Sequence, residues 1–234
     1  MARLPRLSPV NIPQHLIQRG NNRQACFAGE PDYSTYSAWL KEYATEYHVE
    51  IHAWVFMTNH VHLLCTPRAE QAISRMMQSL GRRYVRYFNH TYQRTGTLWE
   101  GRYKACLVEE DDHLFQVYRY IELNPVRAGM VAHPADYRWS SYPINANGKI
   151  SALCTPHALY LALSHNDSER QAHYRALVAE GLTKQQVENI RLSLNKGITL
   201  GNDRFAEQIA VLTGKRLATG KPGRPVGWRK NKDN

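Results

Sequence analysis

Two histidines separated by one residue are the side chains of this sequence best suited to metal chemistry. His60 and His62 lie in the segment 56–65, FMTNHVHLLC, which predicts a turn at 57–59 followed by a short buried strand. Residues i and i+2 of a strand point to the same face, so the two imidazoles stand side by side while Val61, Leu63 and Cys65 face the other way. Neutral imidazole is the commonest metal ligand, and the pair therefore predicts half of a metal site. Two hydrogen-bonded histidines at a strand end are the structural alternative.

A predicted helix at 113–124 offers a nucleophile and a third metal ligand. At about 100° per residue, Tyr118 falls on an apolar arc and Tyr120 on a polar arc, which favours Tyr120 as the accessible phenol. Asn124 lies one turn beyond Tyr120 on the same face, where its carbonyl oxygen is a candidate ligand for a hard cation. Tyr118 and Glu122 have the same spacing and form the competing pair.

The elements that position these residues follow a recognisable order. Apolar and aromatic runs predict strands at 10–19, 49–56, 59–66 and 98–108, and apolar stripes at helical spacing predict three helices between and after them. The order strand, helix, strand, strand, helix, strand, helix is the split βαβ pattern of a ferredoxin-like (RRM-like) fold. We therefore expect an α+β domain with an antiparallel sheet and helices on one face. His52, on a different strand from the histidine pair, is expected to be structural.

The chain carries a strong excess of positive charge. Its 234 residues have a formal net charge of +10 and a sequence pI near 9.5, which favours a polyanionic partner such as nucleic acid. Glu100 is the only acid between Arg75 and Lys104. The aromatic residues among these arginines predict stacking on unpaired bases, although a charged run is also typical of a solvated face. They are Tyr84, Tyr87, Tyr92, Trp99 and Tyr103.

Two groups of polar residues are predicted to contact nucleic acid. The first belongs to the turn after the first strand, for which a plain solvated turn is the alternative, and the second belongs to the arginine-rich helix and the strand that follows. Together the predicted contacts are Arg19, Asn21, Asn22, Arg23, Arg82, Arg83, Arg86, Arg102 and Lys104.

The rest of the sequence predicts two appendages to a catalytic domain. We assign 1–150 to that domain, 151–215 to a small helical region with capping-box sequences, and 216–234 to a flexible basic tail. The four cysteines include no Cys-x-x-Cys pair, which argues against a zinc ribbon and a disulfide framework. No apolar run reaches about 20 residues and no signal peptide is recognisable, so we expect a cytoplasmic protein associated with the nucleoid.

Three segments together resemble a known enzyme family. They are 59–64, NHVHLL; 96–104, GTLWEGRYK; and 119–129, RYIELNPVRAG. In this order they resemble the single-strand tyrosine transposases with a His-hydrophobic-His motif, in particular the branch called REP-associated tyrosine transposases. The resemblance covers about residues 10–142 and also implies a ferredoxin-like fold.

The resemblance implies a role for each candidate residue. His60 and His62 match the metal-binding histidines, and Asn124 matches a polar position that completes the site, where relatives also carry glutamine. The metal is then Mg²⁺ or Mn²⁺, and Tyr120 is the nucleophilic tyrosine. The implied substrate is single-stranded DNA with imperfect hairpins, the repetitive extragenic palindromes (REP) of bacterial chromosomes.

We therefore expect a metal-dependent transposase or endonuclease that cleaves and rejoins hairpin DNA through a covalent phosphotyrosine. A tyrosine hydroxyl, with a pKa of about 10, is a weak nucleophile unaided, and a divalent cation on the scissile phosphate supplies the missing activation. The alternatives are a protein that binds structured nucleic acid without cutting it and a metal nuclease that uses water. Monomer and homodimer both remain open.

Overall fold

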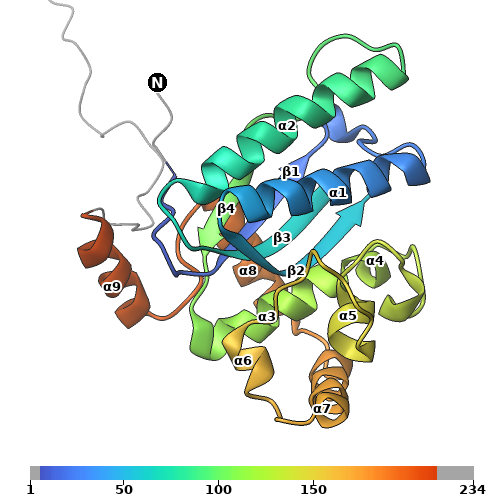
Figure 1. Cartoon of the computed structure of the whole chain (residues 1–234). Coiled ribbons are helices and arrows are strands. Elements are labelled where there is room, and N and C mark those ends of the chain that lie inside the picture. Colours follow the sequence, from blue (N-terminus) through green and yellow to red (C-terminus); the bar gives the residue numbers. More distant parts are fainter. Residues whose placement is uncertain (1–5, 215–234) are drawn as a thin grey trace, which may run out of the picture.

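The computed structural model describes residues 6–214, and the predicted basic tail at 216–234 lies outside the described residues (Figure 1). Its centre is a four-stranded antiparallel sheet of β1 (Gln14–Arg19), β2 (Val49–Met57), β3 (His60–Pro67) and β4 (Lys104–Leu107), in the order β2-β3-β1-β4. A helix connects β1 to β2 and another connects β3 to β4. These connections and the strand order are those of the predicted split βαβ fold. The α+β, ferredoxin-like class is therefore confirmed.

One face of the sheet is covered by α1 (Glu30–Glu46) and α2 (Ala72–Thr91) (Figure 1). The stripe of α2 that the sequence predicts to be buried, from Ile73 to Phe88, is indeed buried against the sheet and α1. Val61, Leu63 and Cys65 of β3 point into this same core. The alternation predicted for β3 is therefore confirmed, and the two histidines must face the opposite side.

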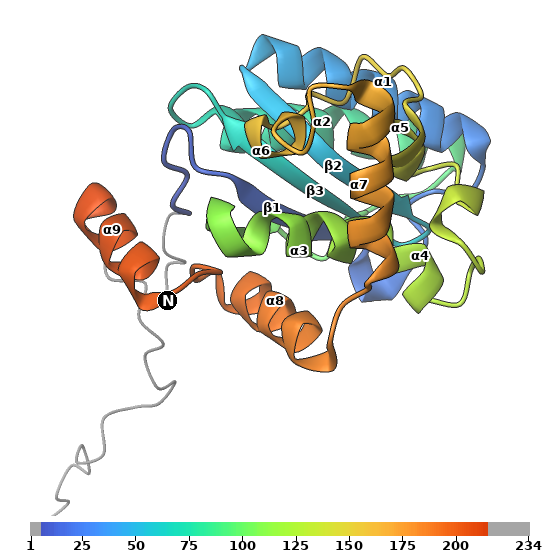
Figure 2. The same ribbon diagram turned by 90° about the horizontal axis from the view of Figure 1, so that it is seen from below.

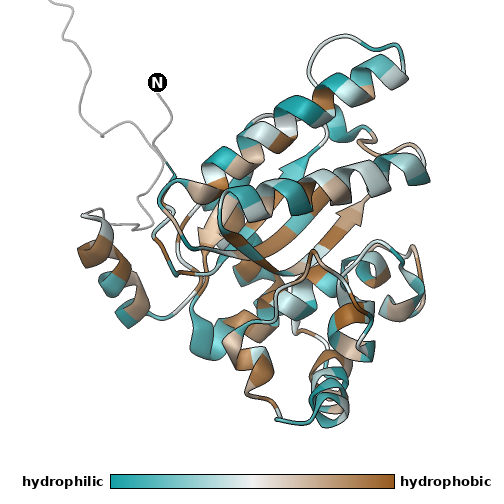
Figure 3. Cartoon of the chain, viewed as in Figure 1, coloured by the Kyte–Doolittle hydropathy of each residue, from teal (hydrophilic) through white to brown (hydrophobic). Residues whose placement is uncertain are grey.

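The opposite face is covered by α3 (Glu110–Glu122), which crosses β1–β3 in Figure 2. The expectation that the helices lie on one face is therefore correct for α1 and α2 only. Both faces of β2 and β3 are buried, so these strands are rich in apolar residues (Figure 3), and the buried polar side chains among them are His52, His62 and Thr66. A chain that continues past the split βαβ unit has this second face available, and α3 buries it.

Further helices follow α3 in the part of the chain that the structure describes. They are α4 (Asn124–Arg127), α5 (Tyr142–Asn147), α6 (Ala158–Leu161), α7 (Asp167–Ala179), α8 (Lys184–Lys196) and α9 (Asp203–Thr213), with single 3-10 turns η1 (Asn21–Arg23) and η2 (Pro134–Asp136). The helical character predicted for 151–215 is confirmed. However, α7 contacts α3 and α5, and α8 contacts β4 and α3, so these helices extend the core of the sheet domain (Figure 2).

Two predicted strands are shorter than expected. The first begins at Gln14 and not at residue 10, and the fourth spans Lys104–Leu107 and not 98–108. Residues 98–103 form an irregular segment joined to β1 by a bridge between Gly20 and Trp99 and by the hydrogen bond from the Glu100 amide to the Arg19 carbonyl, 2.9 Å. Gly101 lies within it, and glycine weakens a strand. Within residues 6–214, no helix is long and apolar enough to span a bilayer.

Candidate active site

His60 and His62 lie side by side on β3, on the face that α3 covers. Their ring centroids are 5.1 Å apart, and they pair across the sheet with Arg19 and Ile17 of β1. His62 is nearly fully buried, whereas His60 at the strand start is partly exposed. The predicted pair is therefore formed, with one ring in the core and one at the surface.

The orientation of the His60 ring is fixed by its neighbour. Asn59 donates a hydrogen bond from Nδ2 to the Arg23 carbonyl, 3.1 Å, which leaves its Oδ1 as the acceptor facing His60. His60 Nδ1 lies 2.6 Å from that oxygen and must donate its proton to it. The other ring nitrogen, Nε2, therefore carries the free lone pair that a metal ligand needs.

A third histidine, His15 of β1, lies behind the pair. Its Nε2 is 2.8 Å from Nδ1 of His62, and its ring is completely buried. Burial lowers the pKa of His15 to about 3 and that of His60 to about 4, and it holds the pKa of His62 well below its usual value. All three imidazoles are therefore neutral at pH 7, as metal ligation requires.

Tyr120 projects from α3 onto this histidine cluster. Its ring centroid lies 5.5 Å from that of His15 and 5.6 Å from that of His62, both edge to face. The tyrosine is only 6 % exposed, so it is less accessible than the polar-arc argument predicts. Its hydroxyl makes no hydrogen bond to any side chain or carbonyl that the structure describes, and it is therefore free to bond an incoming group.

The competing pair, Tyr118 and Glu122, points away from the histidines. Tyr118 is completely buried, and its ring packs against Tyr174 of α7. Glu122 is also buried and accepts hydrogen bonds from Ser141, Asn145 and Tyr174. The structure thus places Tyr120, and not Tyr118, beside His62.

Asn124 and Arg127 follow Tyr120 where the helix changes direction. α3 ends at Glu122, close to the predicted end, but Asn124 is not pushed out of the helical region by the following proline and instead opens α4. Within the described part of the chain the Asn124 side chain makes no hydrogen bond. The Arg127 guanidinium lies over the Tyr120 ring, 4.3 Å from its centroid, and donates a hydrogen bond to the Tyr120 carbonyl. Arg127 therefore brings a positive charge to the tyrosine and restrains its ring.

These donors do not demand zinc, because the set contains no thiolate. Among residues 6–214, no group of three or more His, Cys, Asp and Glu side chains is arranged to hold a metal. The available donors are the Nε2 lone pair of His60, one nitrogen of His62 and the unengaged amide of Asn124. Without a thiolate, such a mixed imidazole and amide set accommodates Mg²⁺ or Mn²⁺.

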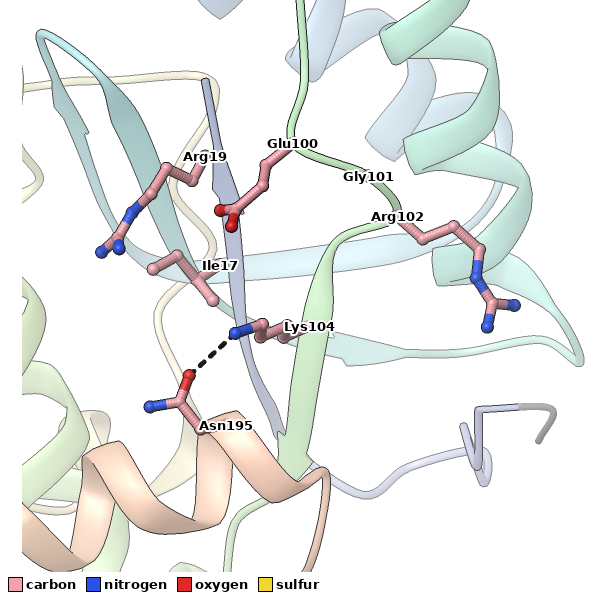
Figure 4. A pocket seen from close by; sticks show the side chains of 7 residues that line it. All are labelled: Ile17, Arg19, Glu100, Gly101, Arg102, Lys104 and Asn195. Atoms are coloured by element: carbon pink, nitrogen blue, oxygen red, sulfur yellow. Dashed lines mark hydrogen bonds between the residues drawn. The ribbon is translucent and has the colours of Figure 1, made fainter. Parts of the chain in front are cut away.

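A hollow of about 290 Å³ opens at Ile17 and Arg19 of β1 (Figure 4), the residues that pair across the sheet with His62 and His60. Arg19, Glu100 and Lys104 surround it, and Asn195 of α8 accepts a hydrogen bond from Lys104 Nζ, 2.9 Å. Arg19 and Lys104 lie on the same face of the sheet as His60 and His62. Arg19 pairs directly with His60, and Ile17 pairs with His62 on one side and with Lys104 on the other. Figure 4 shows the Arg102 side chain pointing away from Arg19 and Lys104. The hollow therefore presents the basic side chains of Arg19 and Lys104 together with the acid Glu100.

The remaining predicted nucleic-acid contacts are not gathered at this site. Asn21, Asn22 and Arg23 form η1 at the end of β1, and Asn22 and Arg23 are exposed. Arg82 and Arg86 are exposed on α2 beside Trp99, on the other side of the sheet from Tyr120. Arg83 pairs with Glu42 of α1 at 2.8 Å and covers the Trp39 ring. The structure therefore gives Arg83 a role in joining α1 to α2.

The prediction that aromatic residues form a stacking surface is wrong for most of them. Tyr84, Trp99 and Tyr103 are buried in the core of the α1 and α2 face. The hydroxyls of Tyr87 and Tyr92 are engaged by the buried Asp32 carboxylate, at 3.0 and 2.8 Å. Helical periodicity explains the burial of Tyr84, because residues 84 and 88 continue the apolar stripe of α2, whereas Tyr92 at the C-cap is 37 % exposed.

His52 is structural, as predicted. It is completely buried on β2, and its two nitrogens lie 2.8 Å from the Thr155 carbonyl and the Thr66 hydroxyl. Two site residues, His15 and Arg127, were not predicted. His15 shares a face with Arg19 by alternation, which was a usable signal, but its pairing with β3 is not encoded locally. Arg127 lies about two helical turns beyond Tyr120, across a proline that obscures the periodicity.

Comparison with known proteins supports one family. The family described as "Transposase IS200 like" matches residues 9–124, which include the sheet, both histidines and Tyr120. No curated protein matches the chain. Among solved structures, a REP-associated tyrosine transposase bound to a REP hairpin is 19 % identical, covers 67 % of this chain and 93 % of its own, and has a TM-score of 0.51.

A candidate transposase from Deinococcus radiodurans R1 is 25 % identical over 52 % of this chain and 96 % of its own, with a TM-score of 0.36 that is too low to define a shared fold. The REP-associated enzyme, by contrast, shares the fold of this chain. The family match and the fold agree with the three sequence segments, and the chain belongs to the IS200-like transposases, a family of DNA strand transferases.

Proposed function

We propose that this transposase cleaves and rejoins single-stranded hairpin DNA through a covalent bond between the DNA phosphate and Tyr120. The observation that carries the proposal is the position of Tyr120, whose ring lies against His15 and His62 and under the Arg127 guanidinium. A phenol with a free hydroxyl, next to neutral imidazoles and a fixed positive charge, has the surroundings of an activated nucleophile. The hairpin-bound REP-associated enzyme, which has the same fold, supports hairpin DNA as the substrate.

Each side chain has a defined task in this proposal. The Tyr120 oxygen attacks the scissile phosphorus, the bond from phosphorus to the 3′ oxygen breaks, and the phenolic proton is replaced by the new ester bond. The released 3′ oxygen takes up a proton and becomes a hydroxyl. Because the phosphate remains in an ester with Tyr120, attack by a second 3′ hydroxyl reverses the step and joins a new strand.

His60, His62 and Asn124 would hold Mg²⁺ or Mn²⁺, which polarises the phosphate and stabilises its developing charge when bound. The Arg127 guanidinium orients the Tyr120 ring and disperses negative charge that develops on its oxygen. Arg19 and Lys104 bind the DNA backbone at the hollow, where phosphate contacts set the position of the strand. Arg23, Arg82, Arg86 and Arg102 lie farther out and are proposed to contact the hairpin stem or its flanks.

The covalent intermediate is the direct test. End-labelled single-stranded hairpin DNA is incubated with protein and Mn²⁺, and the mixture is separated by denaturing electrophoresis, on which a covalent adduct migrates with the protein. We expect an adduct with wild-type protein and none with Tyr120→Phe. Tyr118→Phe is the matched control, because the Tyr118 hydroxyl is buried without a hydrogen-bond partner in the described residues and its loss leaves the helix intact.

Each other outcome contradicts a specific part of the proposal. An equal adduct with Tyr120→Phe would rule out this tyrosine. Free 5′-phosphate products that are indifferent to Tyr120→Phe would identify a water-using nuclease. Tight hairpin binding without cleavage in Mg²⁺ and Mn²⁺ would identify a binding protein.

A further inference from the structure

The two histidines of the predicted metal site differ in how their protons are fixed. His60 Nδ1 faces the Asn59 Oδ1 acceptor, so its proton has one position and its Nε2 is always free. His62 Nδ1 faces another imidazole, His15 Nε2, at 2.8 Å. A neutral imidazole carries one proton on one of two nitrogens, so either ring can be the donor in this bond. The free nitrogen of His62 is therefore set by its neighbour and not by its own position.

The surroundings of the other His15 nitrogen, Nδ1, determine which of the two rings is the donor. His15 Nδ1 is buried and has no hydrogen-bond partner among the described residues. If His15 accepts from His62, its own proton must lie on this Nδ1 and becomes a buried donor without an acceptor. If His15 donates from Nε2, only a lone pair is left unpaired. Orphaned buried N–H groups are the rarer and costlier case, so His15 acts as the donor in the absence of a cation.

This resting arrangement is incompatible with metal ligation by His62. When His15 donates to His62 Nδ1, the His62 proton lies on Nε2, the nitrogen that faces the site. We propose that His15 and His62 form a coupled tautomer pair, in which His15 is a positioning residue that must change from donor to acceptor before His62 can ligate a cation. This inference rests on the cation site of the proposed function.

The exchange conserves protons. The His15 Nε2 proton passes along the hydrogen bond to His62 Nδ1, the His62 Nε2 proton leaves, and one proton is taken up at His15 Nδ1. Each ring remains neutral before and after, and no proton is released in total. Cation binding is therefore weakened by the unpaired His15 N–H that it creates, whereas His60 contributes no such penalty.

The tautomers can be observed directly by long-range ¹H–¹⁵N NMR of the histidine rings in the full-length protein. Without metal we expect His62 and His15 protonated at Nε2 and His60 at Nδ1. With saturating Mg²⁺, His62 and His15 should both become protonated at Nδ1, and His60 should keep its tautomer. A metal-free His62 already protonated at Nδ1, or a His62 that does not change when Mg²⁺ is bound, would overturn the inference.

A variant gives an independent measurement. In His15→Gln, a side-chain carbonyl can accept from His62 Nδ1 with no proton transfer, so we expect about tenfold tighter Mn²⁺ binding, measured by Mn²⁺ electron paramagnetic resonance, on the scale of outer-shell effects. His52→Gln is the matched control, a buried histidine of β2 bonded to Thr66 and Thr155, and its Mn²⁺ affinity should equal that of wild type. Equal or weaker binding by His15→Gln would also overturn the inference.

The result separates this inference from the proposed function. Mn²⁺ binding that is lost in His60→Ala, with no DNA adduct, would refute the phosphotyrosine mechanism and leave the tautomer pair intact. The absence of any His60-dependent Mn²⁺ binding would refute both the tautomer coupling and the cation site.

Discussion

Glu122 is a carboxylate held in the core by the helices of the C-terminal region. Its Oε1 accepts from Asn145 at 2.8 Å and from Ser141, and its Oε2 accepts from Tyr174 of α7 at 2.6 Å. Burial raises its pKa to about 7, against the opposing effect of these three hydrogen bonds. Glu122 thus links α3, which carries Tyr120, to α5 and α7. Because its pKa is raised, its ionisation lowers the free energy of unfolding as the pH rises.

We predict that Glu122→Gln makes the protein more stable at neutral and higher pH. The folded pKa lies above the unfolded value of 4.5, so the protonated form is favoured in the folded state. Its contribution to the free energy of unfolding is complete below about pH 4.5 and is lost as the pH rises through 7. A shift of about 2.5 pKa units corresponds to about 3 kcal/mol at about 1.4 kcal/mol per unit.

Urea unfolding of both proteins between about pH 4 and pH 8 measures this difference. The free energy of unfolding of Glu122→Gln relative to wild type should rise by about 3 kcal/mol across this range. His15, His52, His60 and His62 have lowered pKa values and destabilise the fold as the pH falls, but they are common to both proteins and cancel.

Glu180→Gln, which removes an exposed carboxylate paired with Arg119, is the control and should show no such trend. A difference between Glu122→Gln and wild type that is constant with pH, or that grows toward acid, would refute the reasoning.

Two further predictions concern the residues around Tyr120. Arg127→Ala should slow adduct formation about tenfold, because the guanidinium no longer restrains the Tyr120 ring, which corresponds to about 1.4 kcal/mol in the barrier; an unchanged rate with bound DNA would exclude this role. Arg19→Ala and Lys104→Ala should each weaken binding of single-stranded DNA and reduce its dependence on log salt by about 0.7, as expected for one lost phosphate contact. Arg83→Ala, whose guanidinium is already paired with Glu42, should leave that slope unchanged, and a slope reduced equally in all three would contradict the location of the DNA path at the hollow.

Local sequence patterns predicted most of the architecture. Alternation along β3 placed His60 and His62 on one face and Val61 on the other, because the side-chain period of a strand is fixed by its backbone. α3 ends at Glu122, close to the predicted place, although Asn124 and the proline after it then belong to the short helix α4. The capping box at Thr183 also begins α8 as its sequence indicates. Each of these features depends on residues within a few positions of one another.

Patterns that depend on packing were predicted less well. The strand expected at 98–108 forms only at Lys104–Leu107. Trp99 lies in the core beside Gly81, and residues 98–100 are joined to the end of β1 and the turn after it by an isolated bridge and hydrogen bonds, not by a continuous ladder. Tyr84 was predicted both as part of the buried stripe of α2 and as part of a stacking surface. Its position in the sequence does not show which side of α2 is covered by α1, and the structure buries it. Composition indicates that aromatic and basic residues are mixed, but burial separates them.

The sequence by itself determined the family, the split βαβ order and the histidine pair, because these follow from short-range spacing and motif order. Only the tertiary structure shows that Tyr120, and not Tyr118, lies beside His62, since this depends on which side of α3 meets the sheet. It also decided that His15 contacts His62, because the register between β1 and β3 joins residues 47 positions apart. Such contacts form only when the whole sheet is assembled, and they set the chemistry of the site.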